Sequence, residues 1–106
     1  ERQFHAGLDM AAVYAATVHA AASGTVTFAG ETPGYGKTVV VTHRFGFQTR
    51  YAHLTLIYTR KGAKVEKGDV IGFVGSTGIS TGNHLHYEVI KNQKRINPLN
   101  FIYGTK

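Results

Sequence analysis

The segment "HLHYEVIK" (84–91) decides the fold class, because polar and apolar residues alternate along it. Side chains of a β-strand point alternately to its two faces, so this alternation predicts a strand with one polar and one apolar face. The polar face carries His84, His86 and Glu88. The apolar face carries Leu85, Tyr87 and Val89. We expect the apolar face to join a core and the histidine face to carry chemistry.

Strand patterns of the same kind extend through most of the chain. Strands are predicted for "GTVTFAG" (24–30), "KTVVVTH" (37–43), "GFQTRYAHL" (46–54) and "DVIGFVG" (69–75). Helical periodicity is nearly absent, and we interpret "MAAVYAA" (10–16) as a loop or short turn. The sequence therefore predicts an all-β fold, a compact antiparallel β-sheet or barrel-like sandwich.

The connections between these strands also have recognisable sequences. "HRFGF" (43–47) is typical of a hairpin connection, and "RKGAKVEKGD" (60–69) predicts two turns that flank a short extended piece. The glycines of "STGISTGN" (76–83) permit positive φ and predict a turn before the histidine strand. "INPLNF" (96–101) is expected to form a C-terminal tail packed through Leu99 and Phe101.

Length and composition fit one globular domain. The 106 residues are 42% hydrophobic and 17% charged, so we treat residues 1–106 as a single domain. The chain starts at Glu1 without an initiator Met or a leader, so we expect it to be the C-terminal part of a longer precursor. With no cysteine, any metal must be held by His, Asp or Glu.

The net charge of +6 favours polyanionic partners such as nucleic acid or an anionic envelope polymer. Basic residues cluster in "KNQKR" (91–95), but no recognisable RNA- or DNA-binding motif accompanies them, so we expect no nucleic-acid partner. Apolar stretches fall far short of the roughly 20 residues that cross a bilayer, so we expect no membrane span in this segment.

Two segments could supply metal ligands. "FHAGLD" (4–9) contains His5 and Asp9 with three residues between them, and the strand "HLHYEVIK" adds His84 and His86 on one face. Two histidines and a carboxylate form the ligand set of a catalytic zinc site that keeps one position open for water. Spacing does not decide which of His84 and His86 would bind the metal.

The sequence neighbours of the remaining histidines indicate their roles. In "RYAHLT" (50–55), alternation predicts that Tyr51 and His53 share a face, and His53 could exchange protons beside a zinc-bound water. His19 and His43 fit no ligand position, and we expect structural hydrogen bonds from both. For Glu88, a solvent-exposed position is preferred over a role in orienting a ligand imidazole.

Taken together, these motifs resemble the lysostaphin-type, or LytM-like, zinc metallopeptidases of bacterial cell walls. The resemblance runs in order through "HAGLD" (5–9), residues 34–54, residues 68–89 and "INPLNF" (96–101). It implies the LytM type of fold, the duplicated hybrid motif. It further implies that zinc is bound by His5, Asp9 and His86, with His53 and His84 beside the open coordination position.

Tyr35, in "PGYGK", matches a loop tyrosine that lies near the substrate in some members of this family. The resemblance therefore implies that Tyr35 helps to polarise the scissile carbonyl. A structural tyrosine in a glycine-rich turn is the alternative.

The function implied by the resemblance is a zinc-dependent endopeptidase. It would hydrolyse cross-links or stem peptides of peptidoglycan with a zinc-activated water, outside the cytoplasm, in the periplasm, in the cell envelope or after secretion. Its partners would be peptidoglycan peptides and an inhibitory prodomain or regulatory protein. The alternative is a non-catalytic or partner-dependent LytM-like module that binds cell wall or regulates another wall hydrolase.

Two further classes of protein fit the sequence less well. An iron(II) oxygenase also uses two histidines and one carboxylate, but it has no general need for two further histidines at the metal. A biotin or lipoate carrier would need a lysine between two methionines, and Met10 is the only methionine of the chain.

Overall fold

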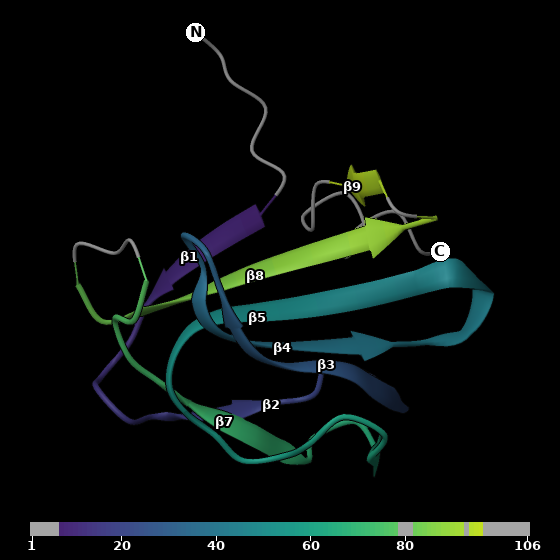
Figure 1. The fold of residues 1–106 in the computed structure, drawn as a ribbon, viewed down its shortest axis with the longest axis horizontal. Coiled ribbons are helices and arrows are strands. Elements are labelled where there is room, and N and C mark those ends of the chain that lie inside the picture. Colours follow the sequence, from purple (N-terminus) through teal and green to yellow (C-terminus); the bar gives the residue numbers. More distant parts are fainter. Residues whose placement is uncertain (1–6, 79–81, 93, 97–106) are drawn as a thin grey trace, which may run out of the picture.

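The fold is a strongly curled antiparallel β-sheet. A computed structural model describes residues 7–78, 82–92 and 94–96, and within them it contains nine strands and one short 3-10 turn (Figure 1). In these ranges, no helix has the length and apolar character needed to cross a membrane. The predicted all-β class is therefore confirmed.

The sheet is organised around one long strand. The strands are β1 (Gly7–Ala11), β2 (Thr17–His19), β3 (Gly24–Thr32), β4 (Gly36–Thr42), β5 (Phe47–Ile57), β6 (Lys64–Val65), β7 (Val70–Val74), β8 (His84–Lys91) and β9 (Lys94–Ile96). Their order is β1-β8-β5-β4-β3-β6, while β9 pairs with β8 and β2 with β7. The first half of β5 pairs with β8 and its second half with β7. Because β5 pairs with two different strands along the same edge, the sheet curls around its core.

The core lies on the inner face of the curl. Its members are aliphatic and aromatic side chains from most strands: Val18, Ala20, Val26, Val39, Val41, Tyr51, Leu54, Val65, Ile71 and Val74. Val39 and Val41 of β4 are fully buried, as the alternation in "KTVVVTH" requires. Burying a valine or leucine side chain stabilises the fold by about 1.5–3 kcal/mol, so this face holds the sheet in its curled form.

Most of the predicted elements are present. The strands predicted over 24–30, 37–43, 46–54, 69–75 and 84–91 correspond to β3, β4, β5, β7 and β8. A 3-10 turn (Arg44–Gly46) makes the hairpin connection between β4 and β5, and the short β6 lies between two turns. The loop predicted over 10–16 begins later than expected, because Met10 and Ala11 belong to β1.

The C-terminal part of the described chain contains one strand that the sequence analysis did not predict. The strand β9 was not predicted, since its three residues are mostly charged and show no alternation; they pair with Val89–Lys91 at the end of β8. The predicted packing of the tail through Leu99 and Phe101 lies outside the described residues.

The prediction for β5 is wrong at one point. Tyr51 and Leu54 are both buried in the core, whereas strict alternation would place them on opposite faces. On β4, Val39 and Lys37 are two residues apart, but their partners Tyr51 and Leu54 on β5 are three apart. One extra residue is therefore inserted in β5, and His53 adopts φ 63° within this bulge. Tyr51 and His53 consequently do not share a face.

Candidate functional site

Three of the histidines singled out from the sequence lie together in the structure. His53 projects from the bulge of β5, and His84 and His86 lie on β8, which pairs with β5. The ring centroid of His53 is 5.2 Å from that of His84 and 6.0 Å from that of His86. Two adjacent strands thus bring together imidazoles that are more than 30 residues apart in the sequence.

A predicted carboxylate ligand also belongs to this part of the sheet. The antiparallel pairing of β1 with β8 places Asp9 directly opposite His86. The Cα atoms of paired residues lie roughly 4.5–5.5 Å apart, a spacing that lets two ligands reach one metal ion. The pairing of β1 with β8 therefore fits the proposed use of Asp9 and His86 as two ligands of the same ion.

The third predicted ligand, His5, lies outside the described residues, and Asp9 is described only as a member of β1. Over residues 7–78, 82–92 and 94–96, no group of three or more His, Asp or Glu side chains is arranged to hold a metal ion. The complete set His5, Asp9 and His86 therefore stays a prediction.

His53 is held from three sides by two loops. Its backbone N–H donates to the Tyr35 carbonyl at 2.8 Å, and its own carbonyl accepts a hydrogen bond from Gly75 N–H at 3.1 Å. Its Nδ1 lies 2.7 Å from the Thr77 carbonyl, which can only accept, so Nδ1 carries the proton. The lone pair of the neutral ring is therefore at Nε2, the nitrogen that can accept a proton.

The loops that hold His53 fit against each other without room for a Cβ at Gly36 or Gly78. Gly36 has φ 72° and Gly78 has φ 76°, and a Cβ on either would overlap the backbone of the other loop. Thr77 joins them further, because its hydroxyl donates to the Leu54 carbonyl and accepts from Lys37 N–H. The position of His53 is thus set by backbone packing of residues 35–37 against 75–78.

His84 is oriented in a similar way by its local backbone. Its Nδ1 lies 3.0 Å from the Gly82 carbonyl, and its backbone N–H donates to the Gly75 carbonyl at 3.2 Å. The proton is again on Nδ1, since the carbonyl can only accept. His53 and His84 therefore have the same tautomer, with the basic nitrogen at Nε2.

Glu88 is a buried member of the site. Only 1% of its surface is exposed, so the expectation of a solvent-exposed glutamate is wrong. Its Oε1 accepts from Arg50 Nη1 at 2.8 Å, and its Oε2 accepts from the Tyr35 hydroxyl at 2.9 Å. Oε2 also lies 2.9 Å from His86 Nε2. The side chain is covered by Arg50 and Tyr35, which come from distant parts of the sequence.

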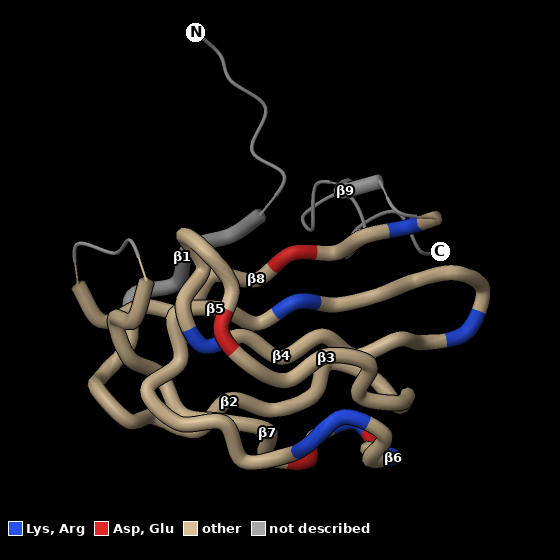
Figure 2. Tube along the Cα trace, in the orientation of Figure 1, with Lys and Arg blue, Asp and Glu red and all other residues tan. Residues whose placement is uncertain are grey.

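The surroundings of Glu88 favour its ionised form. Burial by itself would raise the pKa of Glu88, but hydrogen bonds from His86 and Tyr35 and the charge of Arg50 outweigh it and hold the pKa below its usual value. Figure 2 shows the acidic position on β8 next to a basic position on β5. The carboxylate is therefore a hydrogen-bond acceptor at both oxygens.

Tyr35 lies beside the histidines, in the loop between β3 and β4. Its ring centroid is 5.8 Å from that of His86, and the Arg50 guanidinium stacks over the ring at 4.8 Å. Its hydroxyl donates to Glu88, which is a structural role of the kind considered from the sequence. The predicted role of Tyr35 at a substrate carbonyl stays a prediction.

His43 and His19 have the structural roles expected of them. His43 donates from Nδ1 to the Ser23 carbonyl at 2.8 Å and accepts at Nε2 from the Thr49 hydroxyl at 2.7 Å. His19 donates from Nδ1 to the Gly68 carbonyl at 2.8 Å. Neither ring belongs to the histidine cluster.

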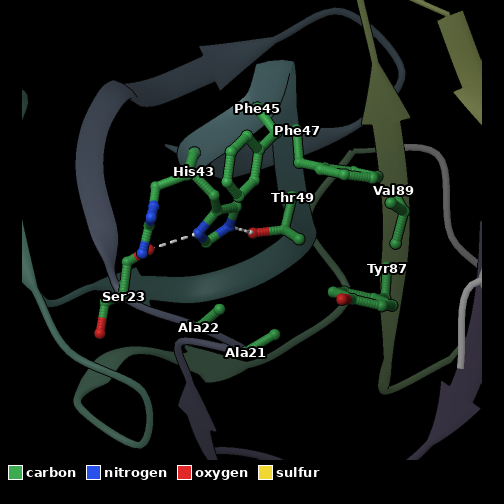
Figure 3. A pocket seen from close by; sticks show the side chains of 10 residues that line it. Ala21, Ala22, Ser23, His43, Phe45, Phe47, Thr49, Tyr87 and Val89 are labelled. Carbon is green, nitrogen blue, oxygen red and sulfur yellow. Dashed lines mark hydrogen bonds between the residues drawn. The ribbon is translucent and has the colours of Figure 1, made fainter. Parts of the chain in front are cut away.

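An apolar hollow of about 370 Å³ lies next to His43 (Figure 3). Phe45, Phe47, Tyr87 and Val89 contribute to its lining. Tyr87 and Val89 alternate with His86 and Glu88 along β8, so the hollow is on the opposite face of this strand. It is therefore separate from the histidine cluster.

Three residues of the site were missed from the sequence, or misjudged. The Thr77 carbonyl bonds to His53, Glu88 bonds to His86, and Arg50 binds Glu88 from the neighbouring strand. Arg50 is the direct partner of Glu88 in the pairing of β5 with β8, so the two side chains lie on the same face of the sheet. A buried carboxylate on β8 would need such a partner.

Comparison with known proteins agrees with the geometry. A sequence profile described as Peptidase family M23 matches residues 3–98. The DD-carboxypeptidase/endopeptidase Mpg of Neisseria meningitidis serogroup B is 47% identical over 103 residues, which are 97% of this chain and 24% of that protein. The murein hydrolase activator NlpD of Salmonella dublin is 33% identical over 97 residues, 91% of this chain and 26% of that protein. The chain thus spans about a quarter of the length of these relatives.

Solved structures give the same fold. The catalytic domain of the antimicrobial peptidase lysostaphin from Staphylococcus simulans matches with a TM-score of 0.87 and 31% identity, over 92% of this chain and 78% of that one. A zinc-containing peptidase from Vibrio cholerae matches with a TM-score of 0.84 and 35% identity, over 88% of this chain and 29% of that one. The LytM type of fold expected from the resemblance is confirmed.

Proposed function

Because the chain belongs to peptidase family M23, we propose that it is a zinc-dependent endopeptidase that hydrolyses peptide cross-links or stem peptides of bacterial peptidoglycan. The observation that carries this proposal is the convergence of His53, His84 and His86 from β5 and β8. The pairing of Asp9 with His86 supports it. The relatives named as an endopeptidase and as a zinc-containing peptidase support the reaction class and the metal.

In this proposal His5, Asp9 and His86 would hold zinc. Imidazole nitrogens and a carboxylate oxygen are suitable donors for this ion. When bound, zinc would activate a water molecule and polarise the scissile carbonyl. The ligand set uses residues of two adjacent strands and of the segment that precedes them.

The proton transfers are assigned to His53 and His84. Each ring has its proton at Nδ1 and its lone pair at Nε2, so each can accept a proton at that atom. One of the two would accept a proton from the attacking water, and either could donate one to the leaving amine. Tyr35 donates its single hydroxyl proton to Glu88 in this structure, so it would have to turn that proton to the scissile carbonyl to stabilise developing negative charge there.

The proposal extends to the whole protein. We propose that residues 1–106 form a single domain within a longer hydrolase that acts outside the cytoplasm, where peptidoglycan lies. Other parts of that protein, or a separate regulator, would control access to the site. The positive net charge of +6 suits an anionic wall polymer.

The test combines metal content with identification of the products. The purified chain is assayed for zinc, then incubated with peptidoglycan sacculi of several cross-link types, and released fragments are identified by mass spectrometry. We expect about one zinc per chain and new amine termini at one defined bond. The His86→Ala variant should lose both zinc and cleavage, whereas the matched control His19→Gln, at an exposed histidine, should keep both. Full cleavage by His86→Ala after metal loading would contradict the ligand assignment.

The similarity to the murein hydrolase activator NlpD favours a second candidate function, a non-catalytic role. In this alternative the domain binds cell wall or regulates another hydrolase without cutting peptide bonds itself. Zinc binding without any product from sacculi, together with stimulation of an added murein hydrolase, would favour it. Cleavage of sacculi by the purified chain alone would reject it.

A further inference from the structure

We propose that Glu88 is a positioning residue that fixes the tautomer of His86, so that His86 presents Nδ1 to the metal while His53 and His84 present Nε2. This inference rests on the proposed function, because it assumes that His86 is a zinc ligand. It concerns residues of β5, β8 and the loop between β3 and β4.

Glu88 makes a hydrogen bond with His86. The two residues are adjacent on one face of β8, and Glu88 Oε2 lies 2.9 Å from His86 Nε2. An ionised carboxylate can only accept, so the shared proton belongs to Nε2. An imidazole that keeps its proton at Nε2 can bind a metal ion only through Nδ1. Histidines that bind metals are commonly oriented by a partner of their second ring nitrogen.

The neighbouring histidines differ from His86 in their hydrogen-bond partners. The Nδ1 atoms of His53 and His84 lie against carbonyl oxygens, of Thr77 at 2.7 Å and of Gly82 at 3.0 Å. Carbonyl partners place the proton on Nδ1, whereas Glu88 places it on Nε2 of His86. One cluster therefore contains two kinds of imidazole. The division matches the proposed roles, since one ring would bind metal and two would exchange protons.

Glu88 is buried and is held by two other side chains. A buried carboxylate is costly unless it is paired and hydrogen-bonded, and an apolar residue at such a position is often at least as favourable for stability. Arg50 is the direct cross-strand partner of Glu88 and binds Oε1, and it stacks on Tyr35, whose hydroxyl binds Oε2. These two residues aim the carboxylate at His86. Its presence is thus better explained by positioning than by stability.

The decisive variant is Glu88→Gln. The amide oxygen would turn toward the Arg50 guanidinium, and the amide NH₂ would then face His86 Nε2 as a donor. This reverses the hydrogen bond and favours the Nδ1–H tautomer of His86. The matched control is Glu31→Gln, which makes the same change at an exposed glutamate of β3.

Two measurements are made on the full 106-residue chain. Ring ¹⁵N chemical shifts in the zinc-free protein identify the tautomer of His86, and competition with a chromophoric chelator gives the zinc affinity. We expect Nε2–H in the wild type, Nδ1–H in Glu88→Gln, and zinc binding weakened by about 10- to 100-fold in that variant. Glu31→Gln should match the wild type in both measurements.

Either of two results would overturn the inference: the Nδ1–H tautomer for His86 in the wild type, or an unchanged tautomer and zinc affinity in Glu88→Gln. The wild-type spectrum decides the question even if the variant fails to fold. Neither measurement uses peptidoglycan. A chain with the expected tautomers and zinc affinities that cuts no sacculi would reject the endopeptidase and keep the positioning role, and the reverse combination would reject only the positioning role.

Discussion

The structure holds His53 and His86, which lie on two neighbouring strands, in different ways. On β5, His53 lies in a bulge with φ 63°, and backbone groups of two loops bind its backbone and its ring. On β8, His86 lies in a regular strand and is oriented by the side chain of Glu88. A ring held by backbone depends on how loops pack, whereas a ring held by a side chain depends on one charged group. Substitutions should therefore affect the two strands in separable ways.

The largest difference between the two strands is expected when the loss of cleavage is compared with the loss of bound zinc. His53→Gln removes a proton acceptor but no predicted ligand, so we expect zinc content to stay at the wild-type level while cleavage falls by about 10²- to 10⁴-fold. Zinc per chain and the initial rate of fragment release from sacculi measure the two effects. His86→Gln is the counterpart and should lose zinc. Loss of zinc in His53→Gln would contradict the distinction between the two strands.

The two strands also differ in how well the sequence predicted them. Alternation placed His84, His86 and Glu88 on one face of β8, and the structure confirms that arrangement because β8 is regular. On β5 the same reasoning failed, since the extra residue beside His53 is defined only by pairing with β4. The residues around His53 do not by themselves indicate how β5 is aligned with β4. His53 nevertheless lies beside His84 and His86, and the bulge is the means by which its ring reaches them.

The burial of Glu88 illustrates the second limit of local reasoning. An isolated glutamate in a strand is most often exposed, and the residues that cover this one are 38 and 53 positions away in the sequence. Pairing of β5 with β8 brings Arg50 opposite Glu88, and the loop before β4 adds Tyr35. The role of His5 and Asp9 as zinc ligands stays a prediction from the resemblance.

The next largest effect should come from the loops that hold His53. Gly36→Ala puts a Cβ at φ 72° into the backbone of Thr77 and Gly78, so we expect a loss of about 2–4 kcal/mol in the free energy of unfolding. The control Gly62→Ala also has positive φ, 94°, but meets nothing within 4 Å, and should lose only about 1 kcal/mol. Urea unfolding measures both. Equal losses of unfolding free energy in the two variants would show that the positive φ alone, and not the contact between the loops, causes the destabilisation.

Both strands share an anchor on the inner face, where Tyr51 and Tyr87 pack with ring centroids 5.5 Å apart. Burial raises the pKa of each hydroxyl above its usual value of 10. When folding raises the pKa of a group, that group stabilises the folded state fully at pH values below its unfolded pKa. The stabilisation is lost as the pH rises from the unfolded pKa toward the folded pKa. We therefore expect the free energy of unfolding to decline above about pH 10, with a shallower decline in Tyr87→Phe. Tyr58→Phe, at an exposed tyrosine, should behave as the wild type.

The smallest expected effect concerns Thr77, whose carbonyl binds His53 and whose hydroxyl ties its loop to β4 and β5. Thr77→Val keeps the shape and the carbonyl but removes the hydroxyl, so Lys37 N–H and the Leu54 carbonyl each lose a partner. We expect a loss of about 1–3 kcal/mol in the free energy of unfolding, a modest fall in cleavage and no change in zinc affinity. Ring ¹⁵N shifts should show His53 still protonated at Nδ1. A changed zinc affinity would mean that the loop also supports the metal ligands, and that β5 and β8 are coupled more closely than their separate hydrogen bonds indicate.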